Sequence, residues 1–417
     1  MVLSEKIEDR KLAGNIAKLL TMVFFQVFLV IVPIAVPFFQ SKGLSMAEVF
    51  ELQAWFGFVV VLGEVPSGYV ADLVGRKWTL VAGTLFVGIG HSFLLIADGF
   101  WGLVLFETFL GIAVSLTSGA DLAMIYDTEI ALGRSERELQ RGIGRLHFMH
   151  GISEGLAAIA ASVVLIWWTM SAVIYVQVAV GWLPIFFALT LVEPPRESIG
   201  ESGDGLREHL GHLGEILRLL LLDGVILRLT FLAMAIWSLT TFYAVWILQK
   251  YWEVMGVELK HFGYLWAFYM VAGGLAGRFA EPLERRLGAT GVLVLAGLLP
   301  ALGYLALAFG SLGVATLLSL SFFLSRGVGV VVLRHAMNRR VPSRYRATAN
   351  SLASFGFRGA FVVTGPIVGH ILDLWGITTT VVLLAVGTLG VFLSIIVPLI
   401  LSVRASERRM TLESASA

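Results

Sequence analysis

Six ionisable side chains lie inside long apolar stretches of this chain: Glu64, Glu107, Asp121, Glu154, Arg326 and Arg358. An ion in such a stretch costs on the order of 3 kcal/mol unless it faces a partner or a water-filled cavity. Groups that are kept at this cost commonly bind a proton or a charged solute. These six residues are therefore the first candidates for a pathway that carries an ion or a solute.

The composition of the whole chain is that of a membrane protein. Hydrophobic residues make up 57% of the sequence and charged residues 14%, whereas roughly 25% charged residues are usual in soluble proteins. The mean hydropathy is +0.85, and the net charge of +1 indicates no particular partner. The absence of cysteine excludes disulfides and thiolate metal sites.

Twelve apolar stretches are long enough to form helices that cross a bilayer, which takes about 20 residues. We therefore predict an all-α integral membrane protein with twelve transmembrane helices. Stretches five and six nearly merge at Trp168, and stretches nine and ten at Gly310. The twelve stretches are 17–40, 47–71, 78–97, 101–126, 144–168, 171–192, 225–250, 260–280, 289–309, 312–336, 347–372 and 377–403.

Lysine and arginine residues predict the side that each loop faces, because cytoplasmic loops collect them. With both termini inside, the outer loops carry only three basic residues, Lys42, Lys250 and Lys260, and the inner loops carry all the basic clusters. The first 18 residues are charged and lead into a stretch long enough to span, which is not typical of a cleavable signal. We expect a multi-pass protein of a bacterial or archaeal cytoplasmic membrane, with both termini cytoplasmic.

The longest polar interval divides the chain into two halves of six predicted helices. We expect an N-terminal bundle at 1–192, a cytoplasmic linker at 193–224, a C-terminal bundle at 225–403 and a cytoplasmic tail at 404–417. Within the linker, leucines recur at helical spacing from Leu206 to Leu220. This pattern predicts an amphipathic helix on the inner membrane surface; an ordinary linker helix is the alternative.

A ten-residue signature occurs twice in the chain, 209 residues apart. The first copy reads Gly68-Tyr-Val-Ala-Asp72-Leu-Val-Gly75-Arg76-Lys77, and the second reads Gly277-Arg-Phe-Ala-Glu281-Pro-Leu-Glu284-Arg285-Arg286. In both copies a glycine precedes an acid, and the acid precedes a basic pair. Because the offset is half of the 417 residues, the repeat indicates that a six-helix unit was duplicated.

The first copy supplies every position of G-x-x-x-D-x-x-G-R-K/R, and with it the chain resembles the major facilitator superfamily. The second copy departs from this pattern, since Glu281 replaces the aspartate and Glu284 the second glycine. The resemblance covers the whole chain. It implies two pseudo-symmetric six-helix bundles with a substrate site between them near the midplane, and secondary transport by alternating access.

The resemblance also implies that the signature loops act as a conformational latch on the inner side. In the family the aspartate faces the N-terminal end of helix 11, and Arg76 is expected to pair with Asp127 at the inner end of helix 4. The first copy should make the stronger contacts with the other half of the chain, because the second has lost a glycine. The alternative is a loop that only anchors the chain by its positive charge. The residues concerned are Gly68, Asp72, Gly75, Arg76, Lys77, Asp127, Glu281 and Arg285.

Helices 4 and 10 line the central cavity in this family, and here they carry opposite charges. An offset of 205 residues, set by the arginines that precede helices 5 and 11, carries Asp121 onto Arg326. We expect this acid and base to form a gate or to anchor a charged substrate. Glu64 and Arg358 form a second candidate pair, at similar depths in helices 2 and 11. Structural pairing without a transport role is the alternative for each carboxylate.

Aromatic residues of predicted helix 7 are candidates for contact with a ring-containing substrate. Trp237 and Tyr243 are expected to face the cavity. Trp246 and Tyr251 are instead expected in the interfacial belt, because they lie near Lys250 at the outer end of this helix.

The function predicted from these features is proton-coupled efflux of a small amphipathic compound or metabolite by an antiporter. Glu107 departs from the family's drug–proton antiporters, which have an arginine near that point of helix 4, and helix 5 lacks their proline-containing glycine motif. Uptake of an organic anion or nutrient, anchored by Arg326 and Arg358, is the alternative within the fold. A membrane receptor or scaffold that does not transport is the alternative from another class.

No catalytic motif occurs in the sequence. It contains neither GxSxG nor GxxxxGK[ST], and His147 and His150 lack the spacing of a zinc protease. We therefore expect no enzyme activity, no cofactor and no metal. The expected partners are a small-molecule substrate, protons and membrane lipid, without nucleic acid, and the protein is expected to be a monomer.

Overall fold

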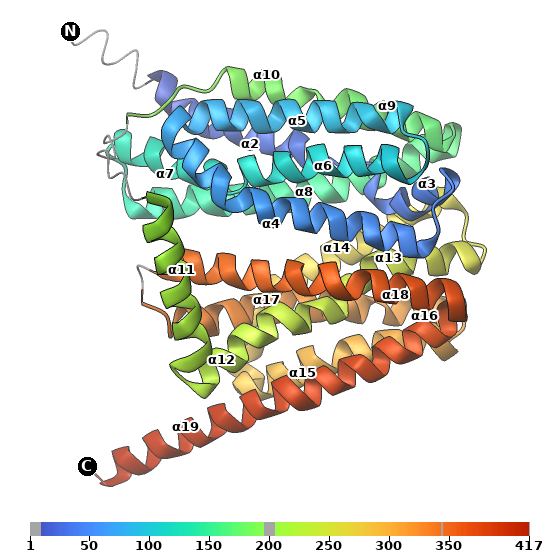
Figure 1. Cartoon of the computed structure of the whole chain (residues 1–417). Helices are drawn as coiled ribbons and strands as arrows, with labels where there is room; N and C mark the ends of the chain where they lie inside the picture. Colours follow the sequence, from blue (N-terminus) through green and yellow to red (C-terminus); the bar gives the residue numbers. More distant parts are fainter. Residues whose placement is uncertain (1–9, 196–204, 343–344, 417) are drawn as a thin grey trace, which may run out of the picture. The chain divides into compact units, whose positions relative to one another are not determined.

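The structure, a computed structural model, describes residues 10–195, 205–342 and 345–416. In these ranges the backbone forms helices joined by short turns, and no strand occurs (Figure 1). The predicted all-α membrane fold is therefore confirmed. Most of the charged N-terminal lead-in and the Gly/Ser-rich part of the linker lie outside the described residues.

Nine stretches of the described chain are long and apolar enough to cross a membrane. The last of them covers 59 residues and breaks at Gly376, where φ is 75°, so it has the length of two spans. Two further predicted helices are shorter, because the first is interrupted and the eighth has 17 residues. The nine are Met46–Glu64, Arg76–Ile96, Gly99–Ala131, Glu136–Trp167, Met170–Leu189, Val225–Val254, Ala280–Phe309, Leu312–Asn338 and Thr348–Ser406.

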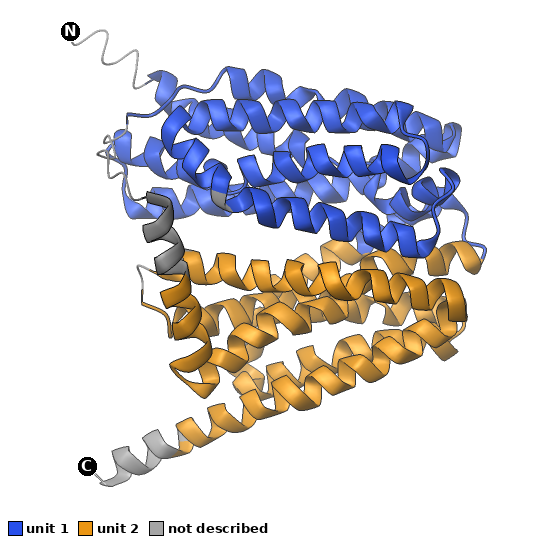
Figure 2. Ribbon diagram, viewed as in Figure 1, with its two compact units in different colours: residues 1–201, 256–268 blue, residues 202–255, 269–417 orange. Residues whose placement is uncertain are grey.

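Contacts divide the chain into two compact units, which Figure 2 shows in different colours. Unit 1 comprises Met1–Glu201 and Gly256–Phe268, and unit 2 comprises Ser202–Met255 and Tyr269–Ala417. The first division falls inside the predicted linker. A short segment from the second half of the chain therefore packs with the first half.

Unit 1 contains the first six predicted transmembrane helices, several of which consist of shorter segments. These are α2 (Asn15–Gln26), η1 (Val32–Ile34), α3 (Ala35–Ser41), α4 (Met46–Val74), α5 (Arg76–Ile96), α6 (Gly99–Thr117), α7 (Ala120–Ala131), α8 (Glu136–Trp167), α9 (Met170–Gly181) and α10 (Leu183–Leu189). The short η3 (Leu259–His261) and the beginning of α14 (Phe262–Arg278) join them.

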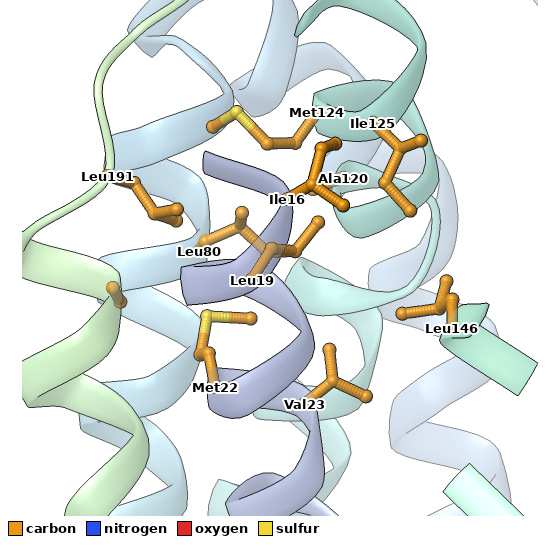
Figure 3. Close-up of a cluster of buried hydrophobic side chains, with 11 residues drawn as sticks. Ile16, Leu19, Met22, Val23, Leu80, Ala120, Met124, Ile125, Leu146 and Leu191 are labelled. Carbon is orange, nitrogen blue, oxygen red and sulfur yellow. The ribbon is translucent and has the colours of Figure 1, made fainter. Parts of the chain in front are cut away.

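The described core of unit 1 includes a cluster around one face of α2 (Figure 3). Ile16, Leu19 and Met22 recur at helical spacing and are buried in one cluster with Leu80 of α5 and Met124 of α7. Because lipid chains are as apolar as these side chains, close packing rather than exclusion from water stabilises such a cluster in a membrane.

Two hydrogen bonds join the start of the first helix to the chain that follows the sixth. The Asn15 side chain donates from Nδ2 to the carbonyl oxygen of Val192 at 2.7 Å. Its Oδ1 accepts from the N–H of the same residue at 2.9 Å. The amide thus satisfies a peptide group beyond the end of α10, and it fixes the position of the residue that follows, Glu193.

Unit 2 contains the linker helix and the remaining predicted helices. Its segments are α11 (Gly205–Leu222), α12 (Val225–Leu232), η2 (Ala233–Trp237), α13 (Ser238–Val254), the rest of α14, α15 (Ala280–Phe309), α16 (Leu312–Leu318), α17 (Leu320–Asn338), α18 (Arg346–Val391), η5 (Phe392–Ile396) and α19 (Val397–Ser416). The segments η2 and η5 are turns of π-helix inside the seventh and twelfth helices.

The predicted linker helix is present as α11, and the described side chains of its C-terminal half pack against unit 2. Ile216 and Leu220 are 2% and 0% exposed, in one cluster with Met337 of α17 and Ala349 of α18. The apolar face of this half therefore contacts protein. The location of α11 on the membrane surface stays a prediction.

Candidate transport site and gating contacts

The first and fourth transmembrane helices of unit 1 are broken inside their apolar stretches. The first breaks between α2 and η1, where Pro33 lacks the N–H that a continuous helix uses. The fourth breaks between α6 and α7 at Gly119, whose φ of 89° favours glycine. A hydrogen bond of 2.8 Å from Nε2 of Gln26 to Oγ1 of Thr117 joins the two breaks. Discontinuous helices of this kind bring polar backbone groups to substrate sites in membrane carriers.

Asp121 lies in the first turn of α7, directly after the break in the fourth helix. Its Oδ1 accepts a hydrogen bond of 2.7 Å from the N–H of Leu122, and the positive end of a helix favours an acid in this position. The side chain is half-buried, whereas Ser118 at the break is exposed. The structure therefore places this acid at a helix terminus rather than in the middle of a continuous helix.

Glu107 is buried between two helices of unit 1. Its Oε1 accepts a hydrogen bond of 2.7 Å from Nε2 of Gln53, which connects α6 to α4. The glutamate is 5% exposed and the glutamine 8% exposed. A buried carboxylate bonded to a neutral amide, without a cation in that contact, is a group that can take up a proton.

A second buried polar contact supports the break in the first helix. Gln177 of α9 accepts at Oε1 from the N–H of Ile31 at 3.2 Å, and its Nε2 lies 3.1 Å from Nε2 of His91. Because the amide nitrogen only donates, the histidine nitrogen accepts and the ring proton lies on Nδ1. Both side chains are 1% exposed, so this buried contact joins α5 and α9 to the break in the first helix.

Arg326 lies against an aromatic cluster in unit 2. Its guanidinium carbon is 5.7 Å from the centre of the Phe242 ring of α13, a distance typical of a cation–π contact. The same ring meets Phe357 and Phe361 of α18 edge-on, at 5.1 and 4.8 Å between centroids. Tyr243 is 6% exposed. The cluster brings a positive charge and aromatic faces together, which suits a substrate with a ring and a negative group.

The other predicted charged residues lie at several places in the two units. Glu64 of α4 is half-buried and Glu154 of α8 is exposed. Arg358 of α18 is half-buried, and its Nε donates to Oγ of Ser354 at 3.5 Å. Each of the two predicted acid–base pairs has one member in each unit, so both pairings stay predictions.

Three aromatic residues of the seventh helix lie elsewhere than predicted. Trp237 is 1% exposed, and its indole N–H donates to the carbonyl oxygen of Ala296 at 3.3 Å, inside unit 2. Gly329 makes room for this ring, since a Cβ there would lie 2.1 Å from it. Trp246 and Tyr251 are 8% and 3% exposed, so neither side chain extends outwards as an interfacial belt requires. Hydropathy alone does not distinguish these core positions from an exposed aromatic belt.

The first signature loop is held by ion pairs. Gly75 has a φ of 112°, which favours glycine, and it turns the chain from α4 into α5. The Arg76 guanidinium contacts Asp72, with 2.7 Å between Nη1 and Oδ1, and Asp127, with 3.4 Å between Nε and Oδ2. The expected proximity of Arg76 and Asp127 is thus present, and their role as a latch stays a prediction.

Glu193, which follows α10, contacts this loop in a way that the sequence did not predict. Its carboxylate accepts from the N–H groups of Arg76 and Lys77, at 2.8 Å each. These N–H groups lie at the start of α5, where a helix has no internal partner for them and where negative charge is stabilised. A Cβ at Gly75 would lie 2.9 Å from the carboxylate. Glycine is therefore needed there for close approach as well as for its φ.

The second signature loop is more exposed. Glu281 and Arg285 form an ion pair, and their side chains are 71% and 77% exposed. With Glu284 in place of the second glycine, the turn occurs later, at Gly288, whose φ is 70°. An exposed pair of this kind contributes little to stability. The local contacts of the two copies thus differ, and the stronger contacts of the first copy with the other half stay a prediction.

Replacing Glu193 with alanine is expected to destabilise the protein by about 2 kcal/mol, because two charge-assisted hydrogen bonds at the start of α5 are lost. Thermal unfolding of the purified protein in detergent measures this as a lower midpoint temperature. Glu281→Ala, which removes an exposed ion pair, is the control and should leave the midpoint nearly unchanged. An equal decrease of the midpoint temperature in the two variants would show that the Glu193 contacts stabilise the protein no more than the exposed ion pair does.

A segment of the second half of the chain contacts α8 within unit 1. The N–H of Tyr264 in α14 donates to Oγ of Ser162 at 3.1 Å. The backbone approaches closely at Gly263, where a Cβ would lie 2.0 Å from the carbonyl oxygen of Ala158. Beyond Phe268 the same helix continues into unit 2. Helix α14 therefore belongs to both units, and its first turns pack against α8.

These features define a multi-pass helical membrane protein of two units, with broken helices and buried charges. The sequence matches the family model of the Major Facilitator Superfamily over residues 16–338, so the chain belongs to that family. It is accordingly a transporter and not an enzyme. A comparison with curated proteins finds no match.

Several solved transporters share the fold. The nucleoside transporter NupG has a TM-score of 0.73 and 13% identity, covering 92% of this chain and 99% of that one. A bacterial homologue of the human lysosomal transporter Spinster, inward-facing and unoccupied, has a TM-score of 0.72 and 15% identity, with coverages of 94% and 97%. A variant of the peptide transporter POT has a TM-score of 0.71 and 16% identity, with 94% of both chains covered. At these identities the likeness shows the fold alone.

Proposed function

We propose that this transporter exchanges protons for a small amphipathic compound or metabolite, and that it exports the compound. Membership in the family supports the transport of a small molecule. The observation that carries proton coupling is Glu107, a buried carboxylate bonded to the neutral amide of Gln53. Such a group can bind a proton in one state of a carrier and release it in another, because the charged form of a carboxyl group is stable next to water and costly when it is buried.

The contact at Gly263 supports alternating access. We propose that this contact breaks and forms again during each cycle, because α14 continues from it into unit 2. A glycine at this point allows close backbone approach with no side chain to be displaced. The break beside Gly119 supports a substrate site in unit 1 near Asp121 and Gln26.

We further propose the cytoplasmic membrane as the location, with both termini inside, from the distribution of lysine and arginine. One chain supplies both predicted six-helix bundles, so we propose that the monomer transports.

The proposed interaction of Asp121 with Arg326 is open to a charge-swap test. Asp121→Arg and Arg326→Asp are each expected to abolish transport, because each places two like charges where opposite charges are proposed. The double variant should regain a measurable part of the rate in proteoliposomes. Failure of the double variant to exceed either single variant would count against the pairing.

Uptake of an organic anion is the second candidate function, and the contact between Arg326 and Phe242 favours it. A guanidinium can bind a carboxylate through two parallel hydrogen bonds, and the rings of Phe357 and Phe361 lie beside the same phenylalanine. In this reading Arg326 is an anchor for the substrate and not part of a gate.

Proteoliposomes that contain a trapped pH-sensitive dye test the function. Amphipathic cations and neutral compounds form one panel, and aromatic carboxylates form the other. Proton movement opposite to that of a compound from the first panel would support export by antiport, whereas gradient-driven accumulation of carboxylates would support the second candidate. No movement in either panel under any gradient would contradict coupled transport and favour a receptor or scaffold.

A further inference from the structure

Unit 2 has an apolar groove along one face of α15. The groove has a volume of about 340 Å³, and its lining residues belong to α15: Leu287 precedes the break at Gly288, and the others follow it up to Leu302. Leu287, Leu298 and Leu302 are 50%, 39% and 44% exposed. Their side chains are thus accessible to the acyl chain of a lipid. The concave surface that they line is elongated along the helix axis.

Arginine side chains gather at the end of the groove that begins at Leu287. Arg285 and Arg286 precede this leucine directly, and both are exposed. From α19, the exposed Arg404 reaches Thr290, with 3.4 Å between Nε and Oγ1. Thr290 directly precedes Gly291, which lines the groove. Helices α15 and α19 contact each other and can be followed in Figure 1.

The acids of the same region leave a net positive charge. Glu281 pairs with Arg285, and the half-buried Glu284 directly precedes that arginine. Arg286 and Arg404 are then the guanidinium groups best placed for an anion at the mouth of the groove.

We propose that this groove binds one anionic phospholipid, with an acyl chain along residues 287–302 and the phosphate at Arg286 and Arg404. Guanidinium groups bind phosphate oxygens through charge-assisted hydrogen bonds. Basic pockets between transmembrane helices are typical sites for anionic headgroups. A zwitterionic headgroup adds an ammonium that the same arginines repel, so phosphatidylglycerol is preferred over phosphatidylcholine.

Native mass spectrometry of the full-length protein in detergent tests this site. Dioleoylphosphatidylglycerol and dioleoylphosphatidylcholine are titrated separately, and the bound lipid per protein is counted. Arg404→Gln, which removes the phosphate contact, and Leu298→Trp, which fills the groove, are each expected to weaken phosphatidylglycerol binding about tenfold. Arg404→Lys keeps the charge and should retain most of the binding. Arg137→Gln, an exposed arginine of α8 in unit 1, is the matched control and should bind like the unaltered protein.

Three results would overturn the proposal. The first is equal binding of the two lipids to the unaltered protein. The second is an unchanged affinity for phosphatidylglycerol in both Arg404→Gln and Leu298→Trp. A loss in Arg137→Gln as large as that in Arg404→Gln would count in the same way, because it would indicate diffuse charge attraction. The third is competition by glycerophosphoglycerol, the headgroup without acyl chains, at the concentration of the lipid, since that would indicate a site for a soluble phosphate. A midpoint temperature like that of the unaltered protein, measured without lipid, shows that each variant is folded.

Discussion

Gly263→Leu is expected to lower the transport rate roughly 30-fold, because added side-chain atoms prevent α14 from closing on α8. A Cβ at this position would lie 2.0 Å from the carbonyl oxygen of Ala158 and 2.6 Å from Oγ of Ser162. Overpacking of this kind costs about 2 kcal/mol, which corresponds to roughly 30-fold in the population of the closed contact. The initial rate of gradient-driven transport in proteoliposomes measures the loss.

The control for Gly263→Leu lies on the same helix. Gly274 of α14 has no heavy atom within 4 Å of the position of an added Cβ, so Gly274→Leu should keep most of the rate. Both variants are compared at equal amounts of folded protein. If Gly263→Leu transports as well as Gly274→Leu, the contact with α8 does not take part in the cycle.

Glu107→Gln is expected to abolish accumulation driven by a proton gradient while leaving substrate binding intact. The substituted amide has almost the same shape and can still accept a hydrogen bond from Gln53, so the contact between α4 and α6 is preserved. The amide does not titrate, so it cannot bind and release a proton as the carboxylate does. Accumulation in proteoliposomes with an imposed gradient should fall to the level of protein-free vesicles, whereas exchange of labelled for unlabelled substrate without a gradient should continue.

Glu154→Gln is the comparison for Glu107→Gln, because this glutamate of α8 is exposed rather than buried. We expect it to retain gradient-driven accumulation. If Glu154→Gln loses the coupling and Glu107→Gln keeps it, the proton site is on α8 and burial is the wrong criterion. If both variants keep it, proton coupling through these carboxylates is excluded.

The helical architecture and the signature loop follow closely from the sequence. In lipid, a stretch of about 20 apolar residues has no stable alternative to a helix or a closed barrel, so the apolar stretches give the helices and most of their ends. The approach of Arg76 to Asp127 is also predictable, because the family signature fixes which helix end each residue occupies. These features depend on the local sequence and on the family.

The polar contacts between helices do not follow from the sequence. Gln26, Gln53 and Gln177 have partners that are 91, 54 and 146 residues away. A rotation of one residue about a helix axis directs such a side chain to another neighbour, so the partner depends on packing that hydropathy does not describe. The one available signal is the amide itself, because a polar group inside an apolar stretch needs a partner.

The break in the fourth helix likewise does not follow from the sequence. The chain contains 45 glycines, and only some of the described ones, such as Gly119, adopt a positive φ. Glycine composition therefore does not locate a break. Consequently the sequence identified Asp121 but not its place at the start of α7.

Cysteine accessibility tests alternating access most directly. The chain has no cysteine, so Ser118→Cys introduces one thiol, at an exposed position beside the break in the fourth helix. A membrane-impermeant maleimide is added to vesicles of either orientation under opposite proton gradients. Alternating access predicts labelling from both sides, with each gradient raising it on one side and lowering it on the other. Labelling from one side alone, unchanged by the gradient, would contradict the proposed mechanism.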